Sequence, residues 1–201
     1  MDRALFTVAA ALVLVLVASA PVSAATLEVQ AQGSAFQPAI VRLAAPGDAV
    51  RWRNLDPWSH TSTGNAPLRY WSSPAIASGQ TYTKVFIAAG IYPYFCQFHP
   101  GMEGSVRVPV RPSPTTGTAA TTFTITWASV VAPSGYRYQV QRRAPAATAW
   151  SAYRTTTARL STFKTSITGN WQFRGRLQRL VDGIWVSSSW SAARKVTVNP
   201  G

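Results

Sequence analysis

The chain has 201 residues, of which 47% are apolar and 12% are charged, and its formal net charge is +13. This apolar content excludes global disorder, and the length allows either one large domain or two small ones. The charge is uneven, because residues 25–110 carry a net charge of +2 whereas residues 111–201 carry a net charge of +11.

The first predicted element is a secretory signal peptide over residues 1–24. Arg3 supplies a positive charge, an apolar run covers residues 4–18, and small residues surround Ala24. The alternative is an uncleaved membrane anchor, but the run is shorter than the roughly 20 residues that a membrane-spanning helix needs. We therefore expect cleavage near Ala24 and an exported protein, secreted, periplasmic or at the cell surface, without a transmembrane segment.

Residues 25–110 form the first predicted domain and contain short runs in which apolar and polar residues alternate. Turn residues such as Pro46-Gly47-Asp48 and Gly90 separate these runs. Two-residue alternation at this spacing is typical of strands in an all-β sandwich or barrel. The predicted strands cover residues 27–31, 41–43, 50–52, 82–86, 92–96 and 106–110.

The first domain also contains the residues that carry chemistry. After the signal peptide, the chain has two histidines, one cysteine and one methionine, namely His60, Cys96, His99 and Met102. Cys96 has no cysteine partner in a compartment that favours disulfides, so a bound metal would account for its thiol. A thiolate, two imidazoles and a weak thioether are the ligands of type 1 copper in electron transfer. We predict one copper ion held by these four residues.

Three other uses of these residues are less consistent with the set. Methionine is a poor ligand for zinc. A nucleophilic Cys96 with a histidine base would leave Met102 and the second histidine without a role. A multicopper oxidase or a copper nitrite reductase needs more histidines than the chain has. The chain is therefore not expected to be an enzyme.

The sequence around the predicted ligands resembles the plastocyanin-like cupredoxins. Residues 90–108, with the short Cys-x-x-His-x-x-Met spacing, look like the copper loop of this family and are most similar to its amicyanin form. The Trp-x-Asn segment at residues 50–54, six positions before His60, is similar to the approach to the family's first histidine. The resemblance covers residues 25–110. It implies a Greek-key β-sandwich with copper at one end and the same four ligands.

Two further expectations come from this resemblance. Family members commonly have asparagine after the first histidine, where this chain has Thr61, so a hydroxyl would have to make the hydrogen bond to the cysteine loop. In related proteins the loop histidine emerges through an apolar surface patch. Pro57, Trp58, Phe98 and Pro100 could form such a patch around His99, or they could simply pack the loop.

A Pro- and Thr-rich segment at residues 111–120 predicts a linker with little to bury. Residues 121–201 again alternate, and their motifs around Trp127, 135–140, 173–177 and 190–198 resemble a fibronectin type III domain. Another immunoglobulin-like sandwich is the main alternative. The predicted core of this second domain consists of Trp127, Tyr138, Trp171 and Phe173.

The charge of the second domain has two interpretations. It could bind an anionic partner such as a cell-envelope polymer, lipid head groups or an acidic protein, or it could be a solvated surface that aids solubility. Nucleic acid is not an expected partner outside the cell. Candidate contributors are Arg142, Arg143, Arg174, Arg176 and Arg179.

The function favoured by these observations is an exported blue-copper protein that carries single electrons between a redox donor and an acceptor. One alternative is an extracytoplasmic copper-sequestering or delivery protein with an adhesive basic domain. Another is an adhesion protein in which the cupredoxin fold serves only as a scaffold. The compact and complete ligand set argues against both.

Overall fold

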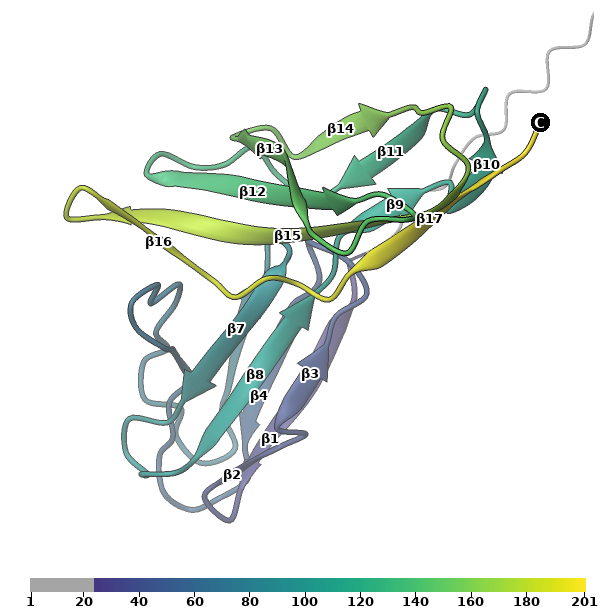
Figure 1. The fold of residues 1–201 in the computed structure, drawn as a ribbon. Coiled ribbons are helices and arrows are strands. Elements are labelled where there is room, and N and C mark those ends of the chain that lie inside the picture. The colour runs from purple at the N-terminus through teal and green to yellow at the C-terminus, as the bar shows by residue number, and fades with distance from the viewer. Residues whose placement is uncertain (1–23) are drawn as a thin grey trace, which may run out of the picture.

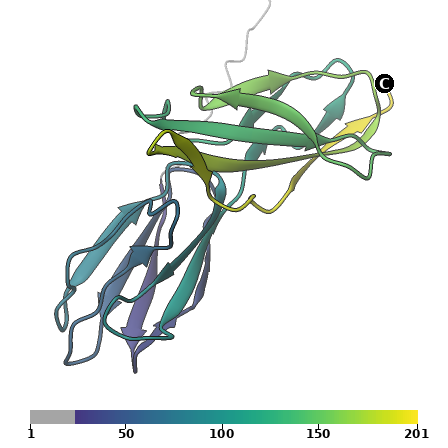
Figure 2. The same cartoon turned by 60° about the vertical axis from the view of Figure 1, so that its left-hand side comes forward.

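The computed structural model of this protein describes residues 24–201, and the predicted signal peptide lies almost entirely outside this range. The described chain forms two β-sandwiches, and the second lies across one end of the first (Figures 1 and 2). All elements between Thr26 and Asn199 are strands, which confirms the predicted all-β class. Within the described range, no helix has the length and apolar character needed to cross a membrane.

The first sandwich consists of two four-stranded sheets. One sheet has the order β2-β1-β4-β6, with β1 (Thr26–Gln32), β2 (Ala35–Gln37), β4 (Ala49–Asn54) and β6 (Thr81–Val85). The other has the order β3-β8-β7-β5, with β3 (Ile40–Arg42), β5 (Thr63–Gly64), β7 (Gly90–Phe95) and β8 (Glu103–Val108). All six strands predicted for this domain are present, and only the short β2 and β5 were not predicted.

The centre of the first sandwich is an aromatic cluster. Trp52 is fully buried, and the ring centroids of Trp71, Tyr82, Phe86 and Tyr94 lie between 5.3 and 6.4 Å from its own. Aromatic pairs at such distances add to the stability gained from burial of their large apolar surfaces. This cluster makes a rigid platform between the two sheets and beneath the loops that follow β4 and β7.

The second sandwich pairs a three-stranded sheet with a larger one. The small sheet has the order β14-β11-β9, with β9 (Arg111–Ser113), β11 (Phe123–Thr126) and β14 (Leu160–Phe163). The larger sheet has the order β10-β17-β15-β12-β13, and β16 pairs with β15. Its strands are β10 (Thr116–Thr118), β12 (Tyr136–Arg143), β13 (Ser151–Thr156), β15 (Gly169–Val181), β16 (Ile184–Ser187) and β17 (Arg194–Asn199).

The core predicted for the second half agrees with this architecture, and the predicted linker does not. Trp127, Tyr138, Trp171 and Phe173 are all buried, as predicted. The segment predicted as a linker, residues 111–120, contains β9 and β10, which pair with β11 and β17. Short strands rich in proline, threonine and glycine lack apolar alternation, so the sequence pattern does not distinguish them from a linker.

The two sandwiches make direct contact through backbone and side chains. The Ala89 N–H donates to the Trp127 carbonyl at 2.8 Å, and the Ile91 N–H donates to the Ser189 carbonyl at 3.0 Å. A Cβ atom on Gly175 would lie 3.1 Å from Val110 and 3.2 Å from Ala89, so a larger residue there would require these neighbours to shift by a few tenths of an ångström. Buried apolar residues of both sandwiches form one continuous core.

Candidate metal centre

The candidate metal centre lies in the loop after β7, at the end of the first sandwich that points away from the second (Figure 1). The chain turns sharply at Pro100 and Gly101, and Gly101 has a φ of 80°, which favours glycine. The Cys96 N–H donates to the Met102 carbonyl at 2.9 Å, and the Met102 N–H donates to the His99 carbonyl at 3.2 Å. These bonds tie both ends of the loop together and fix the positions of its three predicted ligands.

His60 approaches from the neighbouring loop after β4. Its backbone forms a two-way bridge with Ile76, with N···O distances of 3.1 and 2.7 Å. The fully buried Asn54 shapes this loop, because its side-chain amide donates to the carbonyls of Trp58 and Ile76 and its oxygen accepts from the Asp56 N–H. The imidazole of His60 is thereby held at a fully buried position.

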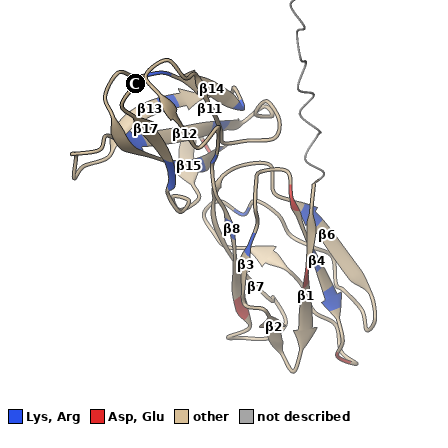
Figure 3. Ribbon diagram, turned by 90° about the vertical axis from the view of Figure 1, so that its right-hand side faces the viewer, with Lys and Arg blue, Asp and Glu red and all other residues tan. Residues whose placement is uncertain are grey.

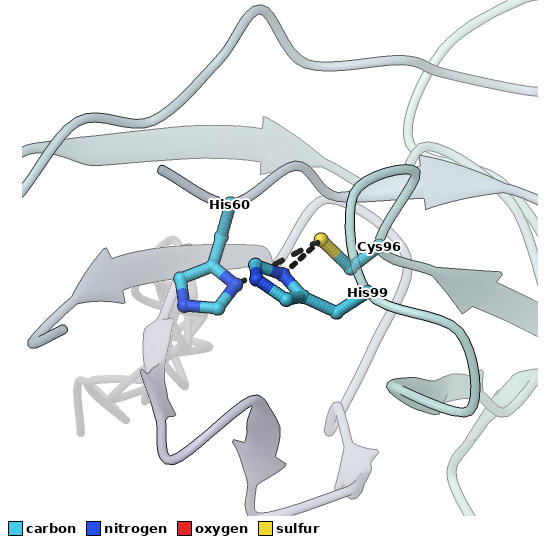
Figure 4. A group of neighbouring side chains, drawn as sticks. All are labelled: His60, Cys96 and His99. Atoms are coloured by element: carbon cyan, nitrogen blue, oxygen red, sulfur yellow. Dashed lines mark hydrogen bonds between the residues drawn. The ribbon is translucent and has the colours of Figure 1, made fainter. Parts of the chain in front are cut away.

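The side chains of His60, Cys96 and His99 converge (Figure 4). The Cys96 Sγ atom lies 3.8 Å from Nδ1 of His60 and 3.4 Å from Nδ1 of His99. All three ligand atoms lie within 4.8 Å of one another. Metal bonds of about 2 Å place the donor atoms of one ion about 3–4 Å apart. The two nitrogens and the sulfur therefore fit a single ion between them.

Met102, the fourth predicted ligand, is buried in the same loop with 2% of its surface exposed. Its backbone is bonded to both Cys96 and His99, as described above. The loop thus places a thioether side chain in the apolar interior of the first sandwich. A buried thioether can serve as a weak copper ligand. It can equally serve only to fill space in the core.

A buried carboxylate that the sequence did not point to orients His60. The Oδ2 atom of Asp56 lies 2.9 Å from Nε2 of His60, and both side chains are buried. Burial raises the pKa of Asp56, but the hydrogen bonds from Gly33, His60 and Ser34 outweigh it and hold this pKa below its usual range. Since an ionised carboxylate only accepts, Nε2 of His60 is the protonated nitrogen. Its Nδ1 lone pair is then free to face Cys96.

Thr61 makes the hydrogen bond that was expected of it. Its Oγ1 atom accepts from the Gln97 N–H at 2.8 Å, and its own N–H lies 3.4 Å from Sγ of Cys96. The two bonds join the His60 loop to the Cys96 loop at this end of the sandwich. A hydrogen bond to a ligating sulfur is one of the features that tune the reduction potential of a copper–thiolate site.

We expect Asp56→Ala to lower the free energy of unfolding by about 2–4 kcal/mol. The substitution leaves the buried His60 ring and the partly buried N–H groups of Gly33 and Ser34 without their acceptor. Urea denaturation of the metal-free protein measures this loss. Asp56→Asn is the matched control, because it keeps one acceptor oxygen and should cost less. Equal stability of the alanine variant and the parent would contradict the assigned role of Asp56.

Part of the surface around His99 is apolar. Pro57, Trp58, Phe98 and Pro100 are all exposed, and the Trp58 ring centroid lies 6.4 Å from that of His99. Trp58 is 48% exposed and Phe98 is 50% exposed, whereas His99 itself is only partly exposed. Large apolar side chains that gather on one surface commonly mark an interaction site. The four residues proposed as a patch are therefore all on the surface, next to the loop histidine.

A two-sheet sandwich with two histidines and a cysteine converging at one pole defines the cupredoxin class. No protein-family model matches the chain. A sequence relative is amicyanin-alpha of Methylorubrum extorquens, which is 37% identical over 88 residues that make up 42% of this chain and 73% of that protein. The chain belongs, through this segment, to the amicyanin family of cupredoxins.

Two solved structures are similar to a comparable share of this chain. The Cu(I) form of an amicyanin variant is 26% identical, with a TM-score of 0.40, and the match covers 44% of this chain and 86% of that one. A purple cupredoxin from Nitrosopumilus maritimus is 23% identical, with a TM-score of 0.38, over 41% of this chain and 98% of that one. Membership of the amicyanin family, together with the donor set at the pole, supports copper as the cofactor of this chain.

Proposed function

We propose that this protein carries single electrons between redox partners outside the cytoplasm, through one type 1 copper ion held by His60, Cys96, His99 and Met102. The observation that carries the proposal is the convergence of the Cys96 sulfur and the two Nδ1 atoms within 4.8 Å. The ion, when bound, supplies one-electron exchange between Cu(II) and Cu(I).

The residues around the centre would keep its geometry fixed during this exchange. Asp56 holds the ring of His60, and Thr61 bonds to the backbone that follows Cys96. The Cys96 and Met102 backbones are bonded to each other, and the aromatic cluster around Trp52 supports both loops from below. A site that cannot rearrange has little to reorganise when an electron arrives, which favours fast transfer over binding and release of copper.

Redox titration of the copper-loaded protein, followed by its visible and EPR spectra, tests this function. We expect a reversible one-electron transition in which the oxidised form shows an intense sulfur-to-copper charge-transfer band. The alternative of copper sequestration or delivery predicts a site that cannot cycle, or one that loses copper on reduction. Copper retention measured after repeated cycles distinguishes the two functions.

We propose three further properties. Residues 1–24 would be removed on export, which would place the protein in the periplasm, at the cell surface or outside the cell. The second domain would be a fibronectin type III-like sandwich, and the pairing of β9 and β10 supports a start at Arg111 rather than after a linker. Its net charge of +11 supports binding of an anionic partner. Figure 3 shows basic positions along several of its strands.

A further inference from the structure

One face of the larger sheet in the second sandwich carries a row in which arginine and tryptophan alternate. The guanidinium carbon of Arg143 lies 4.9 Å from the Trp150 ring centroid, and that of Arg174 lies 4.3 Å from the same ring. Arg174 also lies 4.8 Å from the Trp190 ring, and Arg176 lies 4.4 Å from it. Each tryptophan is thus shared by two arginines, which is a geometry for cation–π stacking.

A fourth arginine, Arg137, stacks in the same way on Trp185 at 4.0 Å. We call Arg137, Arg143, Arg174 and Arg176 the arginine ladder. Neighbouring guanidinium groups that share a ring are within about 10 Å of each other, because each lies less than 5 Å from that ring. Arg143, Arg174 and Arg176 therefore form a row of closely spaced positive charges, and Arg137 lies further along the same face of β12.

Each arginine of the ladder is also held by a glutamine directly opposite it on the paired strand. Arg174 donates twice to Oε1 of Gln141, at 2.9 and 2.7 Å, and Arg176 donates to Oε1 of Gln139 at 2.7 Å. The same cross-strand arrangement joins the other two arginines of the ladder to glutamines: Arg137 to Gln178, and Arg143 to Gln172. Four cross-strand pairs of β12 and β15 thus each consist of one arginine and one glutamine.

The choice of glutamine preserves the charge of the ladder. A glutamate at these positions would accept the same hydrogen bonds and would add an opposite charge, which stabilises a cross-strand pair. Glutamine orients the guanidinium groups without neutralising them. Among residues 24–201, only Arg51 and His60 lie within ion-pair distance of a carboxylate.

The surroundings of the ladder offer no compensating negative charge. The single acidic residue after position 110 is Asp182, in the turn between β15 and β16. Burial and the neighbouring charges of Arg143 and Arg176 lower the pKa of Arg174, although an arginine keeps its proton at any physiological pH. Like charges that lie together and are fixed in place cost stability unless a ligand offsets them.

We propose that the arginine ladder binds a linear acidic polysaccharide, an inference that rests on the anionic partner proposed above for the second domain. Guanidinium groups bind carboxylate and sulfate groups through paired N–H donors, and each has donors beyond those that its glutamine accepts. The indole edges between them can contact the sugar rings that separate the acidic groups of such a polymer. A hollow lined by Gln139, Gln141, Arg176 and Trp190 lies on the same face.

The flat and regular form of the ladder favours a linear polymer over a globular acidic protein. Protein interfaces have a core of apolar anchors surrounded by a polar rim. The tryptophans of the ladder have their faces covered by arginines, so they offer edges rather than an apolar surface. The exposed apolar side chains of this domain, such as Val131, Ile167 and Ile184, lie in other loops and turns or at the end of the β15–β16 hairpin.

The test compares binding of heparin, a linear acidic polysaccharide, by the full-length protein and by the double variant Gln139→Glu/Gln141→Glu. The new carboxylates keep the hydrogen bonds and neutralise Arg174 and Arg176. We expect heparin affinity to fall at least about tenfold, and the slope of log affinity against log salt to decrease by about two. Thermal unfolding should show a variant at least as stable as the parent.

The matched control is Arg159→Gln/Lys164→Gln, which lowers the net charge by the same amount at exposed positions that flank β14, in the other sheet. Its heparin affinity should stay within about twofold of the parent. An equal loss of heparin affinity in both variants would show that the polymer binds the basic surface in general and not the arginine ladder. Duplex DNA bound as tightly as heparin would overturn the polysaccharide assignment. If the parent protein does not bind heparin, the proposed binding of an anionic partner is wrong as well. The charge-transfer band of the copper-loaded protein, measured in parallel, tests the proposed electron transfer separately.

Discussion

Cys96→Ser is expected to abolish the visible absorption band of the copper-loaded protein. The band requires electron donation from a thiolate to Cu(II), and a serine oxygen at the same position cannot supply it. Because Cys96 is 97% buried and serine is nearly the same size, we expect the fold to persist. Visible spectra of parent and variant, each loaded with one equivalent of Cu(II), measure the effect.

Met102→Leu is the control for this experiment. Leucine fills a similar volume, leaves the thiolate and both imidazoles in place, and should retain the charge-transfer band. Circular dichroism of both metal-free variants checks that they fold like the parent. A parent protein that remains colourless with bound copper, or a Cys96→Ser variant that keeps the band, would contradict the proposed centre.

Trp58→Asp is expected to slow electron exchange with a redox partner by at least about tenfold. Trp58 is 48% exposed beside His99, so an aspartate there would have to lose its hydration when a partner covers the patch. The Trp58 carbonyl, rather than its ring, accepts the hydrogen bond from Asn54. The loop that carries His60 should therefore keep its shape, and the visible spectrum should not change.

Val85→Asp introduces the same charge at another exposed apolar residue of the first sandwich. Val85 is 46% exposed and pairs with Ala49, at the end of β4 remote from His60. Stopped-flow reduction of both variants by a small redox protein measures their second-order rate constants. Equal rates for Trp58→Asp and the parent would show that the apolar residues around His99 only pack the loop.

Much of the architecture could be predicted because the alternation of apolar and polar residues along a strand matches the burial of its side chains. The strand at 49–54 has the burial order buried, buried, exposed, buried, exposed, buried, which follows its sequence alternation closely. By contrast, β13 (Ser151–Thr156) has no fully buried residue and forms by pairing with β12. Strands whose stability comes from a neighbour rather than from their own apolar face leave no periodic signal.

The candidate metal centre likewise contains residues that the sequence could reveal and one that it could not. The unusual collection of His60, Cys96, His99 and Met102 is visible in the sequence, because ligand chemistry depends on residue type and on the short spacing within one loop. Asp56 carries no such signal. It contacts His60 only because Asn54 folds the intervening loop back on itself.

Residue identity and local order were enough to establish the all-β class, the set of candidate ligands and the basic character of the second half. How these residues meet follows from the tertiary fold. The register of β12 against β15 places four arginines opposite four glutamines that are between 29 and 41 positions away along the chain. A shift of one residue would turn these side chains to the other face of the sheet, and such long-range pairing is set by the packing of the whole sandwich.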